Sequence, residues 1–303
     1  MKILLVGKSG QLGSSLIKTL PKFIGGKVVN LKMTSREELD LSIPNQCEEL
    51  VIRYQPDYLI NVAAYTAVDL AESQKKLAYK INAEAPMLFA KTLKKIGGKL
   101  IHISTDYVFD GNKSSPYKIT DNVNPLNIYG LSKVQGERNI LEIMSSSEQA
   151  MIIRTSWLYG PTGNNFVTKI INLIKTKNTL KIVSDQISSP TSTISLANFC
   201  WLVIQYMEEG KKISNLIHFS DSGIASWYDL ANAVLEIGNE IGLFSLNPKI
   251  LPINTDEYKT LALRPSYSVL DNSIRMNQFN IDPQHWRVCL RSVLNIINNS
   301  NMS

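Results

Sequence analysis

The stretch Lys2-Ile-Leu-Leu-Val-Gly7-Lys-Ser-Gly10-Gln-Leu-Gly13 decides the fold of this chain. Its first half is a short apolar run without polar alternation, which is typical of a strand buried on both faces. Its second half spaces glycines as G-x-x-G-x-x-G before a stretch of helical periodicity. Glycine lets the backbone turn tightly and lets a pyrophosphate approach it, and the following helix N-terminus offers free N–H groups. The sequence therefore predicts a phosphate-binding turn, with an ordinary strand-to-helix turn as the alternative.

Strand and helix patterns continue to alternate through the first half of the chain. We predict strands at Ile3–Val6, Lys27–Leu31, Tyr58–Val62, Leu100–Ser104 and Met151–Arg154. Helical spacing marks Gln11–Leu20, Pro44–Arg53, Leu70–Ile96 and Leu131–Met144. Such alternation predicts an α/β fold with a doubly wound parallel sheet, that is, a Rossmann fold.

After about residue 160 the pattern loosens, and helical segments near 164–176, 194–208, 227–241 and 283–298 are separated by longer loops. We predict a dinucleotide-binding Rossmann domain over residues 1–160, to which parts of 180–220 return. Residues 161–303 are predicted to form mainly a smaller substrate-binding lobe.

Composition narrows the class of protein. Of the 303 residues, 44% are hydrophobic and 19% are charged, as in an ordinary soluble globular protein. The net charge is +6, but Lys and Arg are scattered, whereas a nucleic-acid binder usually clusters them. We therefore expect a small phosphate-bearing ligand and no nucleic acid. The three cysteines are far apart in the sequence, so neither a zinc ribbon nor a disulfide framework is indicated.

Hydropathy indicates no membrane association. No segment reaches the roughly 18 apolar residues that a membrane span requires. The first residues have the pattern of a strand and not of a signal peptide. We expect a cytoplasmic protein, and a homodimer is left open.

Cofactor preference follows from the end of the second predicted strand. That position normally holds an acid that binds the ribose hydroxyls of NAD. Here Lys32, Ser35 and Arg36 occur instead, and Glu37 and Glu38 come slightly late. Basic and hydroxyl side chains suit a ribose 2′-phosphate, so we expect NADPH, with use of NADH left open. The alternative is that Lys32 and Arg36 belong to a solvated loop.

Several segments are predicted to contact this cofactor. The small residues after the third strand allow the chain to pass close to a ligand, and a loop further along borders the adenine. The predicted cofactor-binding residues are Gly7, Gly10, Gln11, Leu12, Gly13, Lys32, Arg36, Asp40, Leu41, Ala63, Ala64, Tyr65, Tyr129 and Lys133.

Tyr129 and Lys133 form a Tyr-x-x-x-Lys pair, and at i and i+4 both side chains project from one face of a helix. A nearby ammonium favours the phenolate, so such a tyrosine can protonate a developing alkoxide as hydride arrives. Ser104 and Thr105 end the fourth strand, where ligands of parallel sheets bind. We predict Thr105, Tyr129 and Lys133 as the catalytic residues. Alone, the Tyr-x-x-x-Lys pair would equally suit a surface helix.

Longer motifs resemble one family. They are Gly7–Gly13, Asn61–Asp69, Ser104–Gly111, Pro125–Glu137, Arg154–Tyr159, Gly163–Phe166, Asp185–Thr191, Ser226–Tyr228 and Arg264–Ser268. In this order they resemble the dTDP-4-dehydrorhamnose reductases, which are extended short-chain reductases. The resemblance implies NADPH-dependent reduction of dTDP-4-dehydro-β-L-rhamnose to dTDP-L-rhamnose, the last step of dTDP-rhamnose synthesis.

The resemblance also implies a sugar pocket. Trp157 would lie near the reacting carbon, and Arg264 would offer paired N–H donors to a phosphate oxygen. The predicted substrate-binding residues are Val68, Asp69, Thr105, Asp106, Tyr107, Trp157, Asn165, Gln186 and Arg264. For Trp157 a place in the core is the alternative. Trp227 is interpreted as starting a helix of the second lobe, Asn82 as a structural polar residue, and His102 and His218 as packed residues.

Some relatives need magnesium, held partly by an acid just after the third glycine. Ser14 and Ser15 stand there in this chain, so we expect no metal at that place, and a Mg²⁺ requirement is left open.

Two other functions fit the same motifs. One is reduction of another nucleotide-linked 4-keto sugar. The other is an NADP-binding regulatory subunit that resembles the β subunit of methionine adenosyltransferase. The intact Thr105, Tyr129 and Lys133 favour an enzyme.

Overall fold

Within residues 1–145 and 149–302, which the computed structural model describes, the apolar runs pair as a six-stranded parallel sheet. The strand order is β12-β7-β6-β5-β1-β4. Their bounds are β1 Lys2–Val6, β4 Asn30–Thr34, β5 Tyr58–Asn61, β6 Lys99–Thr105, β7 Ala150–Thr155 and β12 Leu216–His218. From β1 the chain first crosses to β4 on one side of it, and then returns to form β5 on the other side. The switch point between β1 and β5 is where open parallel sheets bind ligands.

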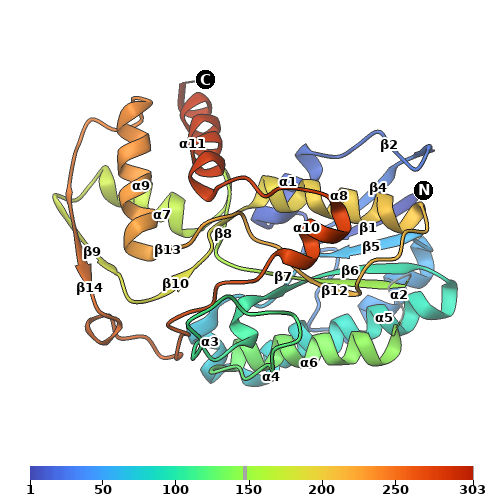
Figure 1. Ribbon diagram of the computed structural model, residues 1–303. Coiled ribbons are helices and arrows are strands. Elements are labelled where there is room, and N and C mark those ends of the chain that lie inside the picture. The colour runs from blue at the N-terminus through green and yellow to red at the C-terminus, as the bar shows by residue number, and fades with distance from the viewer. Residues whose placement is uncertain (146–148, 303) are drawn as a thin grey trace.

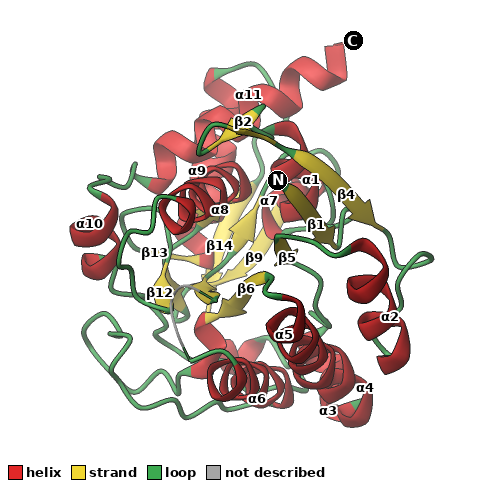
Figure 2. Cartoon of the chain, turned by 90° about the vertical axis from the view of Figure 1, so that its right-hand side faces the viewer, coloured by secondary structure: helices red, strands yellow, loops and turns green. Residues whose placement is uncertain are grey.

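Helices cover both faces of the sheet, as Figures 1 and 2 show. On one face α1 (Gln11–Lys18) and α8 (Thr193–Glu208) pack on the apolar side chains of the strands. On the other face lie α2 (Pro44–Tyr54), α5 (Ala85–Ile96) and α6 (Ile128–Ile143). The predicted doubly wound α/β fold is thereby confirmed.

A second hydrophobic core lies beside the sheet, at the left of Figure 1. It is formed by α7 (Phe166–Ile174), α9 (Trp227–Glu240) and α11 (Trp286–Met302), together with the parallel pair β9 (Thr179–Val183) and β14 (Lys249–Ile253). Both α8 and β12 come from the second half of the chain and pack with the Rossmann sheet. None of the helices in the described ranges combines the length and apolar character that crossing a bilayer requires.

Short elements connect these bodies. They are β2 (Phe23–Ile24), β3 (Lys27–Val28), α3 (Val68–Ser73), α4 (Lys75–Tyr79), the π-helix η1 (Lys80–Glu84), the 3₁₀ turns η2 (Asp106–Val108) and η3 (Thr255–Glu257), β8 (Leu158–Tyr159), β10 (Ile187–Ser188), β11 (Thr191–Ser192), β13 (Ala225–Ser226) and α10 (Ser273–Phe279).

Two predicted elements were wrong in their extent. The strand expected at Lys27–Leu31 is divided, because Gly25-Gly26 closes a β2–β3 hairpin and the sheet strand β4 begins only at Asn30. The single helix expected over Leu70–Ile96 is divided into α3, α4, η1 and α5. Pro86 lacks an N–H group and its ring would clash with the carbonyl four residues earlier in a continuous α-helix. The π-turn before Pro86 avoids that clash.

Candidate active site

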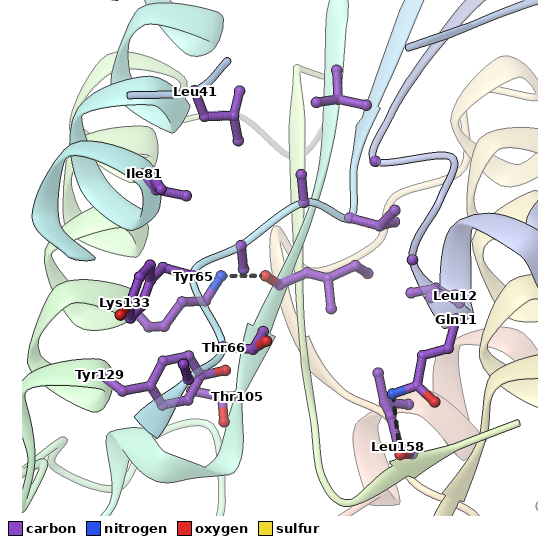
Figure 3. Close-up of a pocket in the computed structure, with 18 of the residues that line it drawn as sticks. Gln11, Leu12, Leu41, Tyr65, Thr66, Ile81, Thr105, Tyr129, Lys133 and Leu158 are labelled. Carbon is purple, nitrogen blue, oxygen red and sulfur yellow. Dashed lines mark hydrogen bonds between the residues drawn. The ribbon is translucent and has the colours of Figure 1, made fainter. Parts of the chain in front are cut away.

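A cavity of about 810 Å³ opens at the switch point of the sheet. The glycine turn after β1 and the loop after β5 line one side of it. The carboxyl ends of β6 and β7 and the first turns of α6 complete it. Figure 3 shows Tyr129, Thr105 and Lys133 on one wall, with Gln11 and Leu12 across from them.

The glycine turn is built for close approach. Gly7 has a φ of 100°, and a Cβ there would lie 2.9 Å from the backbone nitrogen of Ala63. A Cβ on Gly13 would lie 2.2 Å from the carbonyl oxygen of Gly7. Gly10 is the N-cap of α1 and has no side chain to cap the helix. The first N–H groups of α1 therefore remain available to an anion.

Of the predicted cofactor residues, Gly7, Gly10, Gln11, Leu12, Arg36, Asp40, Leu41, Ala63, Ala64, Tyr65, Tyr129 and Lys133 line the cavity. Gln11 is fixed by donating from Nε2 to the carbonyl of Leu158 at 3.2 Å. Gly13 lies beneath the turn and not on the cavity wall. The structure does not bring Lys32 to the cavity either, because its side chain is exposed within the edge strand β4.

Asn82 holds the loop after β5 in place. Its Oδ1 accepts from the N–H of Tyr65 at 2.8 Å, and its Nδ2 donates to the carbonyl of Tyr65 at 3.1 Å. The same Nδ2 lies 3.0 Å from Oγ of Ser132 on α6. Asn82 is almost fully buried, so these bonds explain its presence as a structural link between three segments.

Tyr129 and Thr105 meet at the mouth of the cavity. Burial raises the pKa of Tyr129 to about 12, the nearby hydroxyl of Thr105 works against that rise, and the charge of Asp106 adds to it. The ring of Tyr107 packs edge-on against Tyr129, with centroids 5.9 Å apart. Tyr129 is therefore a protonated phenol in this structure, as a proton donor must be.

Lys133 is almost fully buried in the same wall of the cavity. Its Nζ donates to the carbonyl of Ile103 at 2.6 Å and lies 3.3 Å from Nε2 of His102. Burial lowers the pKa of Lys133 to about 8, while the charge of Glu137 acts in the opposite direction. We expected Lys133 to lower the pKa of Tyr129, but burial dominates that phenol.

His102 is packed, as its apolar strand suggested, and it contacts Lys133. Asn61 accepts from the N–H of Ala63 through Oδ1, which turns its Nδ2 toward Nδ1 of His102 at 3.1 Å. The two ring nitrogens thus face Nδ2 of Asn61 and Nζ of Lys133, which are both donors, and a neutral ring can accept from only one of them. Burial, followed by the charge of Lys133, holds the pKa of His102 well below its ordinary value. A neutral imidazole thus lies under the lysine.

The predicted sugar residues form two groups. Thr105, Asp106 and Trp157 line the cavity. Trp157 adopts a φ of 43°, a left-handed conformation that is rare for an aromatic residue, and its ring stacks on Trp227 with centroids 3.4 Å apart. Asp69 lies on α3, where its carboxylate pairs with Arg264 at 3.0 Å and accepts from the N–H of Ala262.

Six predicted sugar residues do not line the cavity, namely Val68, Asp69, Tyr107, Asn165, Gln186 and Arg264. Asn165 is the N-cap of α7, where its Oδ1 accepts from the N–H of Thr168 and its Nδ2 donates to the carbonyl of Gly160. Gln186 is held between Trp227 and Thr255. Val68 begins α3. Local hydrogen bonds explain Asn165 and Gln186 without a ligand.

Sequence reasoning missed a set of hydroxyls around Asp106. Ser188, at the end of β10, and Ser268, from a later loop, donate to Oδ2 of this buried carboxylate, and Thr105 donates to its Oδ1. Burial raises the pKa of Asp106 to about 6 in spite of these bonds. Both serines lie within motifs noted above, but nothing in their spacing indicated a shared partner.

Comparison with known proteins gives a consistent picture. The family model described as the RmlD substrate binding domain matches residues 1–299. A dTDP-4-dehydrorhamnose reductase of Aggregatibacter actinomycetemcomitans is 35% identical over 293 residues, covering 96% of this chain and 98% of that protein. The spore coat polysaccharide biosynthesis protein SpsK of Bacillus subtilis (strain 168) is 39% identical over 293 residues, covering 97% and 96%.

Among solved structures, a dTDP-4-dehydrorhamnose reductase from Bacillus anthracis in complex with NADP superposes with a TM-score of 0.87 at 33% identity, covering 97% of this chain and 99% of that one. UDP-glucose 4-epimerase from Thermotoga maritima, at 17% identity and a TM-score of 0.79, shares the fold alone. The likeness to the reductases therefore exceeds what a common Rossmann architecture explains. It confirms the resemblance predicted from the sequence: this chain belongs to the dTDP-4-dehydrorhamnose reductase family.

Proposed function

We propose that this protein reduces the 4-keto group of dTDP-4-dehydro-β-L-rhamnose to give dTDP-L-rhamnose, with NADPH as the reductant. One observation carries the proposal: Tyr129 and Thr105 meet on the wall of a cavity whose opposite wall is the glycine turn. The names of the relatives support this reductase and not a regulatory subunit of methionine adenosyltransferase.

The cavity suits a nicotinamide dinucleotide in its steric and polar character. Cβ atoms at Gly7 and Gly13 would collide with Ala63 and with the carbonyl of Gly7, so glycine at both positions allows the tight turn before α1. Within the described residues, the buried hydroxyls of Ser104 and Thr155 have no hydrogen-bond partner, and both residues line the cavity. Such groups await a ligand or water. Gly10, Gln11 and Leu12 would hold the pyrophosphate, and Lys133 the nicotinamide ribose.

When bound, the reduced nicotinamide would supply hydride to C4 of the sugar. Tyr129 would donate a hydrogen bond to the ketone oxygen and then its proton to the alkoxide. Thr105 would support that bond once its hydroxyl turned from Asp106 toward the substrate. Lys133, mostly charged at neutral pH given a pKa of about 8, would stabilise the resulting phenolate. Thr105 and Lys133 are buried and Tyr129 is half-buried, which limits the competition of bulk water for the proton.

The sugar would occupy the side of the cavity formed by Trp157, whose ring is oriented by stacking on the ring of Trp227. Asp69 and Arg264 form an ion pair outside the cavity, and the guanidinium has further donors for a phosphate oxygen. The proposal includes no metal at the glycine turn, because Ser15 is buried and donates to Thr193.

A turnover assay tests the function. Purified protein should oxidise NADPH with dTDP-4-dehydrorhamnose and more slowly with GDP- or UDP-linked 4-keto sugars. Tyr129→Phe should lower kcat about 10²–10⁴-fold with the NADP⁺ dissociation constant little changed, because the phenolic proton is lost and the ring remains. Tyr79→Phe is the matched control, since Tyr79 is exposed on α4.

Two outcomes would overturn the proposal. The first is full turnover by Tyr129→Phe. The second is tight NADP⁺ binding by the wild type with no turnover of any keto sugar, which is the result that a regulatory subunit would give.

A further inference from the structure

The loop after β4 places the carboxylate of Glu38 against Lys8 and a backbone N–H beside the cavity. Ser35 and Arg36 line the cavity next to the glycine turn. Glu38 lies on the same loop, and its Oε2 accepts from Nζ of Lys8 at 2.9 Å and from the N–H of Ser35 at 2.8 Å. Lys8 itself follows Gly7 in the turn, so one carboxylate oxygen joins the glycine turn to the loop.

The donors that hold Glu38 are those that a ribose 2′-phosphate requires. An ammonium and a backbone N–H are strong donors to an anionic oxygen. A further basic residue, Arg36, stands two positions before Glu38 in the sequence and lines the cavity. The hydrogen bond from Lys8, followed by that from Ser35, lowers the pKa of Glu38 to about 2. The side chain is therefore an anion throughout the physiological range. Its carboxylate accepts from Lys8 and from the Ser35 N–H, and a second anion at this edge of the cavity would compete for the same two donors.

We propose that Glu38 is the specificity residue for the adenosine end of the cofactor, acting as an internal competitor of the 2′-phosphate for Lys8 and the Ser35 N–H. When the ribose carries a 2′-hydroxyl, the carboxylate stays on Lys8 and Ser35 and accepts from the hydroxyl. When the ribose carries a 2′-phosphate, Glu38 swings out and the phosphate takes its place. This competition gives the protein use of both cofactors, and it rests on the proposed function only in requiring that a nicotinamide dinucleotide binds here.

The structure also excludes the neighbouring acid from this role. Glu37 is exposed one residue earlier and has the same charge, whereas the two donors meet Glu38. Replacing either glutamate by glutamine changes the net charge equally, but only replacement of Glu38 removes the contact with the two donors. Lys8 and Glu38 are 36% and 42% exposed, so the ion pair can open without disturbing the core.

The experiment compares Glu38→Gln with Glu37→Gln in binding and in turnover. Dissociation constants of NADP⁺ and NAD⁺ are measured by calorimetry without sugar, and kcat/KM is then measured for NADPH and NADH. Glu38→Gln should raise the affinity for NADP⁺ relative to NAD⁺ roughly five- to tenfold, the range for one charge at a partly exposed site. Glu37→Gln should leave the ratio within about twofold. Adding Lys8→Met to Glu38→Gln should lower NADP⁺ affinity and leave NAD⁺ affinity nearly constant.

An equal shift of the ratio in both glutamine variants, or no shift in Glu38→Gln, would overturn the inference. The proposed function would survive either result, because the wild type would still bind cofactor and reduce the sugar. Failure of the wild type to bind either dinucleotide would instead remove the proposed function and this inference with it.

Discussion

Lys133 shows that a residue of the site opposes the stability of the fold. Its side chain is 1% exposed, and burial lowers its pKa from 10.5 to about 8. A lowered lysine pKa contributes stability that is present above the unfolded pKa and is lost as pH falls through the folded pKa. Below about pH 8 the buried ammonium therefore destabilises the folded state, by up to about 3 kcal/mol.

Lys133→Met should make the protein more stable and inactive. We expect its free energy of unfolding at pH 7 to rise by about 1–2 kcal/mol, since loss of the bond to Ile103 offsets part of the gain. The gain should shrink by more than half toward pH 10, where the wild-type lysine is neutral when folded. Urea unfolding at both pH values measures this, with Lys91→Met as the exposed control. A variant less stable than wild type at pH 7 would contradict the argument.

For single residues, the sequence predicts which side chains lie at the carboxyl edge of the sheet, but it does not predict their hydrogen-bond partners. Thr105, Tyr129 and Ala63 line the cavity because each follows a strand or begins the next helix. By contrast, the pairing of Asp69 with Arg264 joins positions 195 residues apart. Such a contact depends on how a loop packs against a distant helix, which no local pattern encodes.

Helix α7 shows, for a whole element, that its existence can be predicted from the sequence while the contacts of its residues cannot. Its apolar periodicity and the Asn165 start signal make its existence predictable. The role of Asn165 was less accessible, because an asparagine before a helix can cap it or contact a ligand. In the structure the side chain forms a capping box with Thr168.

Asn165→Ala should therefore destabilise the fold more than it weakens sugar binding. Loss of an N-cap lowers the free energy of unfolding by about 1–2 kcal/mol, and the Gly160 contact places this cap at the upper end. The KM for the sugar should change less than about twofold. Asn172→Ala on the exposed face of α7 is the control and should be neutral or slightly stabilising. A tenfold rise in KM with unchanged stability would restore Asn165 as a substrate contact.

Elements were least predictable where the chain departs from regular geometry. The π-turn η1 is invisible to a period of 3.6, although Pro86 signals an interruption. The β2–β3 hairpin is too short to show alternation, so the second sheet strand was placed three residues early. The deciding interactions there are a steric clash and a tight turn, not hydrophobic periodicity.

At the scale of the whole molecule, Asp106 ties the catalytic strand to the second half of the chain. It follows Thr105 at the end of β6 and accepts from Ser188 in β10 and from Ser268 in a later loop, both in the second half of the chain. A buried carboxylate that bonds two distant segments fixes the wall of the cavity. It also makes the stability of the assembled molecule depend on pH.

The sign of that dependence follows from the pKa of Asp106, which burial raises from 3.8 to about 6. A raised carboxyl pKa contributes stability that is present below the unfolded pKa and is lost as pH rises through the folded pKa. Between about pH 4 and 6 this group therefore lowers the free energy of unfolding. Asp221 shifts in the same direction, but it is common to wild type and variant and cancels in their difference.

Asp106→Asn has no such titration, so its stability relative to wild type should increase between pH 4 and pH 7 by up to about 3 kcal/mol. Asp110→Asn provides the control on the same segment. Burial of Asp110 is outweighed by hydrogen bonds from Asn112, Asn124 and Tyr117, and its pKa is lowered from 3.8. Because the titration of Asp110 lies below about pH 4, the stability of its variant relative to wild type should stay nearly constant from pH 4 to pH 7. Denaturant unfolding of the three proteins at pH 4, 5.5 and 7 measures both trends, and parallel pH profiles for the two variants would show that Asp106 is not the buried acid that couples the segments.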